Sequence, residues 1–286
     1  MANYHKGKKM KKRILASIIF SVLFLSNIHG KEIFNFFSTG SGDIFKLNPV
    51  MDGVLLGTGA ALTGTYIVTD KILKLNDNVF DGNLLDKNDV NAFDRTFMKP
   101  YSKPLNLLAT GFVGLELISP LVFIAADKEE WFTIGTMYIE AFLLSYGIKE
   151  LAKILVDRPR PYMYFDGYPQ KKVDEGDWCK SFPSGHTTNA FLGASFTSYV
   201  FWKYFPDSPW RFVVAGGTYS IAIATGILRM MSGNHFCTDV LAGAAIGTAC
   251  GLLVPFLHTI TAKSAKNNSR LSLNISPFDV GVSVKL

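Results

Sequence analysis

Residues 240–261 read VLAGAAIGTACGLLVPFLHTIT, and this stretch decides the fold class. About 20 apolar residues are needed to cross a bilayer as a helix. The stretch has that length, and its small residues let helices pack closely in lipid. Stretches of similar character lie at residues 53–69, 104–126, 131–153, 187–205 and 212–228. Together they predict an all-α, integral membrane bundle of about six transmembrane helices, and they disfavour a large soluble helical core.

The composition also favours a membrane protein. Charged residues make up 18% of the 286-residue chain, whereas soluble domains carry about 25%. Hydrophobic residues make up 48%, which excludes an intrinsically disordered chain. Three Cys are too few for a disulfide scaffold or a structural zinc site.

The excess positive charge lies at the N-terminus. Lys and Arg total 29 and Asp and Glu total 23, and six of the basic residues fall within residues 6–13. The rest of the chain is balanced, so we expect no nucleic-acid partner. The basic cluster precedes an apolar run at residues 14–25, which is too short to span a bilayer comfortably. This order predicts a signal peptide over residues 1–30, with an uncleaved N-terminal anchor as the alternative.

Two further regions follow the N-terminal segment. We expect residues 31–262 to form the membrane-embedded domain and residues 263–286 to form a polar tail. In the tail, apolar residues alternate with polar ones on both sides of a turn signal at residues 276–279. This alternation predicts strands, and a frayed tail is the alternative.

Two carboxylates, Glu116 and Glu140, fall inside apolar segments. A carboxylate within a membrane span is a functional candidate by default. We favour a structural explanation, in which each forms a hydrogen bond between helices.

Polar residues gather at the ends of the predicted helices in three places. The first begins at Lys153, the second covers residues 181–186, and the third runs from Arg229 to Asp239. If the segments cross the membrane in turn, all three places open onto the same face. The sequence therefore predicts a polar site at one end of the bundle.

The residue types in these places suit a phosphate. His235 and Asp239 are four residues apart and share one helix face. A carboxylate bonded to one imidazole nitrogen fixes the tautomer and leaves the other nitrogen able to attack. Ser184 and Gly185 precede an apolar run, and the N–H groups of a helix start bind anions.

Three cations complete the set, which as a whole describes a phosphate pocket. Taken singly, each residue has a structural explanation, such as the snorkelling of a basic side chain at a helix end. Their joint occurrence in this order favours the pocket. The cations are Lys153, Arg160 and Arg229.

The three places resemble the signature of the type 2 phosphatidic acid phosphatases. That superfamily also contains bacterial non-specific acid phosphatases, glucose-6-phosphatase and vanadium haloperoxidases. Arg158 begins a second Arg-Pro pair, but only Arg160 has the family's spacing from Lys153. Leu228 departs from the family, which often has Ser before the Arg. The matching residues are Lys153, Arg160, Pro161, Pro183, Ser184, Gly185, His186, Arg229, His235 and Asp239.

The resemblance implies a role for each matching polar residue. His235 attacks phosphorus and forms a phosphohistidine, Asp239 orients His235, and His186 protonates the leaving oxygen and then activates water. Side-chain cations neutralise the phosphate, so neither a metal nor a cofactor is implied. The phosphate-binding residues are Lys153, Arg160, Ser184, Gly185 and Arg229.

These features predict a membrane phosphatase that hydrolyses a lipid phosphate monoester or diphosphate at the bilayer surface. Three alternatives stay open: a phosphatase for soluble phosphomonoesters, a vanadate-dependent haloperoxidase, and a non-catalytic binder of lipid phosphates. The intact His186, His235 and Asp239 argue against the last. Nothing in the sequence indicates an oligomeric state.

The membrane face of the site is predicted differently by two signals. A cleaved signal peptide and the distribution of Lys and Arg place it in the cytoplasm. The resemblance favours the outer, periplasmic face of a bacterial inner membrane, which we adopt. On that face thiols oxidise, so we expect a disulfide between Cys179 and Cys237.

Overall fold

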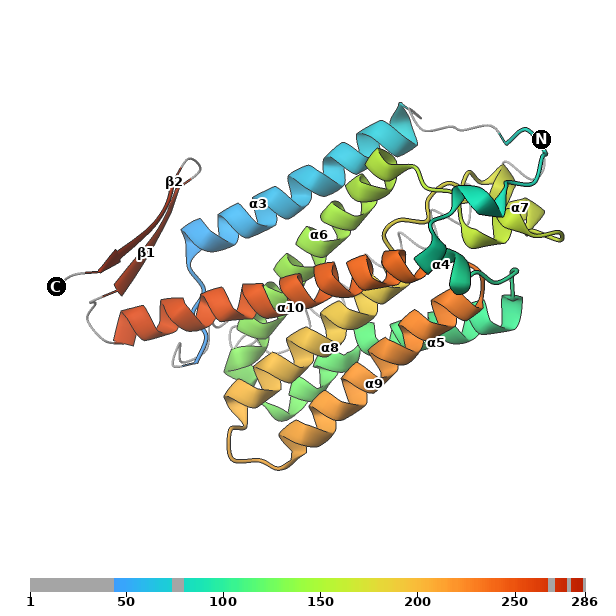
Figure 1. The fold of residues 1–286 in the computed structure, drawn as a ribbon. Coiled ribbons are helices and arrows are strands. Elements are labelled where there is room, and N and C mark those ends of the chain that lie inside the picture. Colours follow the sequence, from blue (N-terminus) through green and yellow to red (C-terminus); the bar gives the residue numbers. More distant parts are fainter. Residues whose placement is uncertain (1–43, 74–79, 267–270, 277–278, 285–286) are drawn as a thin grey trace, which may run out of the picture.

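The computed structural model describes residues 44–73, 80–266, 271–276 and 279–284, with side chains described as far as residue 260. The predicted signal peptide or anchor over residues 1–30 lies outside the described residues. Every one of the six apolar segments forms a helix (Figure 1). These helices are α3 (Pro49–Tyr66), α5 (Lys103–Leu117), α6 (Trp131–Val156), α8 (Gly185–Tyr204), α9 (Trp210–Met231) and α10 (Cys237–Lys266).

Short elements join the long helices, and most of them lie at one end of the bundle (Figure 1). The α-helices among them are α4 (Ala92–Thr96) and α7 (Gln170–Asp174). A π-helical turn, η1 (Ile67–Ile72), continues α3. The remaining turns are 3₁₀-helical: η2 (Lys87–Asp89), η3 (Ser119–Ala125), η4 (Lys128–Glu130) and η5 (Pro161–Tyr164).

Helix α8 lies at the centre of the bundle and packs against α5, α6, α9 and α10 (Figure 1). More than half of its residues are buried. The approach of α10 is close, because a Cβ added at Gly243 would lie 2.6 Å from the carbonyl oxygen of Ser184. The absence of a side chain at Gly243 therefore brings the starts of α8 and α10 together.

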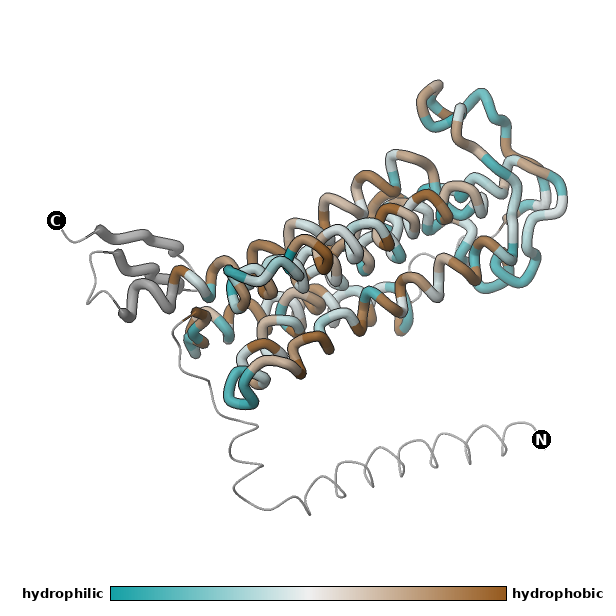
Figure 2. Tube along the Cα trace, turned by 90° about the horizontal axis from the view of Figure 1, so that it is seen from below, coloured by the Kyte–Doolittle hydropathy of each residue, from teal (hydrophilic) through white to brown (hydrophobic). Residues whose placement is uncertain are grey.

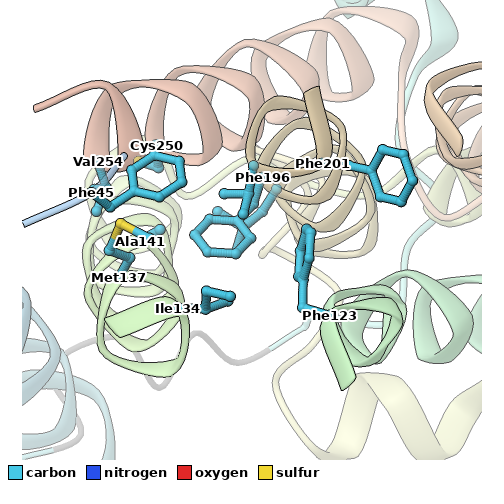
Figure 3. Packing of buried hydrophobic residues seen from close by; sticks show 11 residues of the cluster. Phe45, Phe123, Ile134, Met137, Ala141, Phe196, Phe201, Cys250 and Val254 are labelled. Carbon is cyan, nitrogen blue, oxygen red and sulfur yellow. The ribbon is translucent and has the colours of Figure 1, made fainter. Parts of the chain in front are cut away.

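The apolar core lies between α6, α8 and α10, and Figure 3 shows its aromatic and aliphatic side chains. Phe196 of α8 and Met137 of α6 are fully buried there. Phe45, which precedes α3, joins the same cluster beside Val254 of α10. The core therefore ties the start of α3 to the C-terminal part of α10.

Among the described residues, three helical segments are long and apolar enough to cross a membrane, and they mark the chain as an integral membrane protein. They are Lys103–Ala125, Trp210–Met231 and Cys237–Ile260. Figure 2 shows hydrophilic residues gathered in the loops at the end that holds α4 and α7. The sequence predicts about six spans. The described part of the chain has a helix at each of the six positions, but only three of these helices are candidate spans. The central helix α8 is surrounded by protein, so its side chains need not be as apolar as those that face lipid.

The tail contains an antiparallel hairpin of β1 (Leu271–Ser276) and β2 (Asp279–Val284), in which Leu271 pairs with Val284. It lies beside the end of α10, which continues to Lys266 and so passes the expected domain boundary at residue 262 (Figure 1).

The expected disulfide is not formed. Within the described residues, Cys179, Cys237 and Cys250 are all thiols. Cys179 is buried and its Sγ lies 3.8 Å from the carbonyl oxygen of Gly176, in its own loop.

Candidate active site

The candidate site lies where four helix ends meet. The C-terminal ends of α6 and α9 and the N-terminal ends of α8 and α10 lie at the same end of the bundle (Figure 1). A turn with Gly233 at φ +68° joins α9 to α10, and a Cβ there would lie 2.5 Å from the carbonyl oxygen of Lys99. The predicted convergence of the three polar places is therefore present, and the turn that carries His235 is held by the loop before α5.

Arg160 is the buried centre of the cation cluster, with 5% of its surface exposed. Its Nη2 donates to Asp177 Oδ1 at 2.6 Å, and its Nε donates to the carbonyl oxygen of Asp177 at 2.8 Å. Its Nη1 donates to the carbonyl oxygen of Asn234 at 2.9 Å and reaches His235 Nε2 at 3.0 Å. Arg160 is thus locked from one side and presented to His235 on the other.

The tautomer of His235 follows from its two partners. Nδ1 lies 2.7 Å from the carbonyl oxygen of Ser181, which only accepts a hydrogen bond. Nε2 faces the guanidinium of Arg160, which only donates. Nδ1 therefore carries the proton, and Nε2 presents its lone pair toward the cations.

His235 is held in the neutral form at physiological pH. Burial lowers the pKa of its imidazole well below the usual range, and the positive charges of Arg160, Arg229 and Lys153 lower it further. A neutral imidazole with one nitrogen fixed by a carbonyl oxygen is a competent nucleophile.

The expected bond between Asp239 and His235 is replaced by an indirect connection. The nearest Asp239 oxygen is 3.7 Å from His235 Nδ1, because that nitrogen donates to the Ser181 carbonyl oxygen instead. Asp239 Oδ2 accepts from Ser181 Oγ at 2.5 Å and from the backbone N–H of Phe236 at 2.9 Å. Asp239 therefore supports the Ser181 segment that orients His235.

Arg158 holds this carboxylate in place. Its Nη1 donates to Asp239 Oδ1 at 2.6 Å, and its Nη2 donates to Asp94 Oδ2 at 2.8 Å. Asp94 in turn accepts from both the backbone N–H and the hydroxyl of Thr238. Arg158 begins the Arg-Pro pair that lacks the family's spacing from Lys153. Its side chain nevertheless connects its own loop, after α6, with α4 and with the start of α10.

The start of α8 lies against the end of α6, as an anion site requires. Ser184 is the N-cap of α8, and its Oγ lies 2.8 Å from Thr187 Oγ1. A Cβ added at Gly185 would lie 3.3 Å from Lys153 Nζ, which places that ammonium beside the helix start. Lys153 Nζ also forms an ion pair with Glu150 at 3.0 Å.

Helix α5 contributes two side chains that sequence reasoning missed. Asn106 Oδ1 accepts from the guanidinium of Arg229, which is buried at the end of α9. Thr110 Oγ1, one turn later, donates to the carbonyl oxygen of Asn106 and lies 3.1 Å from His186 Nε2. Since the hydroxyl proton of Thr110 is already used, Thr110 accepts from His186 Nε2. Asn106 and Thr110 are far from Arg229 and His186 in the sequence and belong to no motif.

Helix α7 and the loop after it add a further cation and its counter-ion. Lys172 Nζ donates to Asn234 Oδ1 at 2.8 Å and lies 3.4 Å from Asp177 Oδ2. Burial, together with the positive charge of Arg160, lowers the pKa of Lys172 to about 8. Burial alone would raise the pKa of Asp177, but Arg160 and Lys172 outweigh that effect and lower it below its usual range. Lys172 is thus a cation of the site that can lose its proton in mildly alkaline solution.

Known proteins share this region. Residues 135–261 match the PAP2 superfamily. The lipid A 1-phosphatase of Porphyromonas gingivalis is 42% identical over 79 residues, which make up 28% of this chain and 16% of that protein. The bacitracin transport permease protein BcrC of Bacillus licheniformis is 30% identical over 194 residues, 58% of this chain and 91% of that protein. The phosphatidylglycerophosphatase B of Bacillus subtilis is 37% identical over 162 residues, 52% of this chain and 73% of that protein.

The matched region contains all three polar places and most of the bundle around them. Two of these relatives are similar along more than two thirds of their own length, so the likeness extends beyond the motifs. The chain therefore belongs to the PAP2 superfamily and is a phosphoric ester hydrolase of that kind.

Proposed function

We propose that this chain hydrolyses a lipid phosphate, a monoester or a diphosphate, through a phosphohistidine formed on His235. The observation that carries the proposal is the neutral, oriented imidazole, whose Nε2 lone pair faces Arg160 at 3.0 Å. A phosphate is the ligand that this arrangement favours, because its oxygens accept from Arg160 while its phosphorus faces Nε2.

In the first step, Arg160, Lys153 and Arg229 bind the phosphoryl oxygens together with the N-terminal end of α8 at Ser184 and Gly185. Nε2 of His235 attacks phosphorus, and the bond from phosphorus to the leaving oxygen breaks. His186 donates a proton to that oxygen. The imidazole becomes positively charged as the phosphohistidine forms, and the carbonyl oxygen of Ser181 stabilises it at Nδ1.

In the second step, His186 accepts a proton from water and the resulting hydroxide attacks phosphorus. The bond between phosphorus and Nε2 breaks, and phosphate leaves with His235 neutral again. Asp239 acts in both steps as a positioning residue, because it contacts Ser181 and Arg158 rather than the phosphate. The side-chain cations supply the positive charge, so the proposal requires no metal in the reaction.

A lipid substrate is supported by the membrane helices and by the relatives. Lys103–Ala125, Trp210–Met231 and Cys237–Ile260 can hold the site at a bilayer surface. Two relatives are named for a phosphate on lipid A and on phosphatidylglycerophosphate. We include α3, α6 and α8 in a six-helix membrane domain over residues 31–262, preceded by a signal peptide or anchor.

Phosphate release tests this function. The purified chain in detergent is given lipid phosphate monoesters, lipid diphosphates and soluble phosphomonoesters, with a chelator present during a short assay. We expect release from lipids by the wild type and none by His235→Ala. Faster release from soluble esters than from lipids would indicate a phosphatase for soluble phosphomonoesters. Halide oxidation that depends on added vanadate would indicate a haloperoxidase. Binding without release would indicate a non-catalytic protein.

We also propose that the site faces the periplasm of a bacterial cell, at the inner membrane. Single cysteines placed at the two ends of the bundle test this orientation. Lys171 is exposed beside the site and Asp207 is exposed in the loop between α8 and α9, at the other end. A membrane-impermeant maleimide should label Lys171→Cys in intact spheroplasts and leave Asp207→Cys unlabelled. The reverse pattern would place the site in the cytoplasm.

A further inference from the structure

A second buried cluster of ionisable residues lies at the far end of α10, and the proposed reaction does not use it. His258 Nε2 is 3.1 Å from Asp52 Oδ1 and 3.4 Å from Glu140 Oε2. These three atoms all lie within 4.8 Å of one another and come from α10, α3 and α6. Glu140 and His258 are fully buried, whereas 14% of the Asp52 side chain is exposed.

The orientation of His258 requires a proton or a cation between Nε2 and the two carboxyl groups. Nδ1 lies 2.9 Å from the carbonyl oxygen of Val254, so Nδ1 carries a proton. In a neutral imidazole, Nε2 then presents a lone pair to two carboxylates, which is repulsive. Either a second proton or a cation must therefore lie between Nε2 and the carboxylate oxygens.

One divalent cation balances the charge of this cluster, whereas a single proton does not. Two carboxylates and a neutral imidazole carry a net charge of −2, so neutralising the buried cluster takes either two added protons or one divalent cation. Neither oxygen of Glu140 has a hydrogen-bond partner, and among the described residues no Lys or Arg forms a salt bridge with Asp52 or Glu140. A divalent ion neutralises both carboxylates and gives Glu140 a bonding partner.

The distances also suit an ion. Ligand atoms at about 2.1 Å from a tetrahedral Zn²⁺ are about 3.4 Å apart, and the separations of 3.1 and 3.4 Å from Nε2 are close to that value. A metal-bound His donates its other nitrogen to a backbone carbonyl or a carboxylate, as His258 does to Val254. The partly exposed Asp52 gives access for the ion and for a water as fourth ligand.

We propose that Asp52, Glu140 and His258 bind one divalent transition-metal ion, represented here by Zn²⁺. Imidazole combined with carboxylates suits such an ion better than Mg²⁺ or Ca²⁺. The site is structural, because it lies roughly 30 Å along α10 from the start of that helix and joins α3, α6 and α10. The backbone N–H of Lys46 donates to the carbonyl oxygen of His258 at 3.2 Å, which ties the segment before α3 to the same point.

Zinc binding by the full-length chain tests the proposal without any assay of activity. The chain is purified in detergent without a polyhistidine tag, stripped with a chelator and titrated with Zn²⁺. The test variant is Glu140→Gln. The matched control is Glu116→Gln, which makes the same change at another buried glutamate within an apolar helix.

We expect the wild type and Glu116→Gln to bind one equivalent of Zn²⁺, and Glu140→Gln to bind it at least about tenfold more weakly. Saturating Zn²⁺ should raise the unfolding temperature of the first two proteins by roughly 5–10 °C and leave that of Glu140→Gln unchanged. Co²⁺ in place of Zn²⁺ should give visible absorption bands that Glu140→Gln lacks.

A second variant, Asp52→Asn, changes the partly exposed ligand and covers the case in which Glu140→Gln does not fold. Two results would overturn the proposal. The first is a wild type that binds no stoichiometric Zn²⁺. The second is equal binding by the wild type and by both ligand variants.

Discussion

His235 lies just before the start of α10 and His258 lies in the C-terminal third of that helix, and both donate from Nδ1 to a backbone carbonyl oxygen. Their Nε2 atoms meet opposite charges. Nε2 of His235 faces Arg160, whereas Nε2 of His258 faces Asp52 and Glu140. The same tautomer therefore suits the proposed anionic ligand near one end of the helix and the proposed cation near the other.

This difference shows that the surrounding charges, rather than the histidine itself, decide what a buried imidazole binds. At the active-site end, the cations come from helix termini and from one loop. At the far end, the carboxylates come from within two helices. Pairs of variants, one at the active site and one away from it, can therefore separate effects on the reaction from effects on the stability of the fold.

The largest difference is expected between His235→Ala and His258→Ala. Loss of the proposed nucleophile should lower kcat by at least about 10⁴-fold with the fold intact. His258→Ala should lower the unfolding temperature but change turnover, measured well below that temperature, by less than about threefold. Phosphate release and thermal unfolding of both variants check this. A similar loss of turnover in both variants would contradict the assignment of His235 to the reaction and of His258 to stability.

Arg160→Lys should have the next largest effect. A lysine cannot make the four hydrogen bonds of Arg160 at once, so Asp177, Asn234 and His235 lose their common partner. We expect kcat/KM to fall by about 10²–10³-fold. Arg211→Lys, which changes an arginine stacked on Trp202 at the far end, is the matched control. If Arg160→Lys were as active as that control, Arg160 would have no role in binding the phosphate.

Asp239→Asn should reduce kcat by roughly 10²-fold with little change in KM. A directly bonded carboxylate in a Ser-His-Asp triad is worth about 10⁴-fold, but Asp239 reaches His235 through Ser181. Steady-state kinetics measure the split, with Glu116→Gln as the control for a buried carboxyl change. A loss near 10⁴-fold would point to a direct bond between Asp239 and His235 during the reaction.

The smallest effect concerns pH. Because the pKa of Lys172 is lowered to about 8, its charge is present below that pH and is lost above it. The KM of the wild type should therefore rise by about threefold between pH 7 and pH 9. Lys172→Gln should show a high KM at both pH values, while Lys203→Gln at the far end should behave as wild type. If the KM of Lys172→Gln rose by the same factor between pH 7 and pH 9, another group would cause the pH dependence.

The six helices and the meeting of the three motifs could be predicted, because apolar length and local spacing are visible in one chain. The contact of Asp239 with Ser181 could not, because both a helix face and a motif spacing suggested a direct bond to His235. Asn106, Thr110 and Lys172 reach the site only through packing between distant segments. Only three of the six helices in the described residues are apolar enough to count as candidate spans, and the central helix α8 is not among them because protein surrounds it.

The far cluster shows the same limit more strongly. Asp52 and His258 are separated by 206 residues, and Glu140 reads as a lone polar residue in an apolar helix. No spacing rule connects the three. Only the packing of α3, α6 and α10 brings the cluster together.

Trapping of the covalent intermediate tests the central claim most directly. The wild type and His186→Ala are mixed with a lipid phosphate and quenched in alkali, which preserves a phosphohistidine, and the peptides are sequenced by mass spectrometry. We predict phosphate on His235 in both proteins, with more of it in His186→Ala because its hydrolysis is slower, and none on His258. Phosphate on His186, or turnover of substrate without any phosphorylated histidine, would contradict the account.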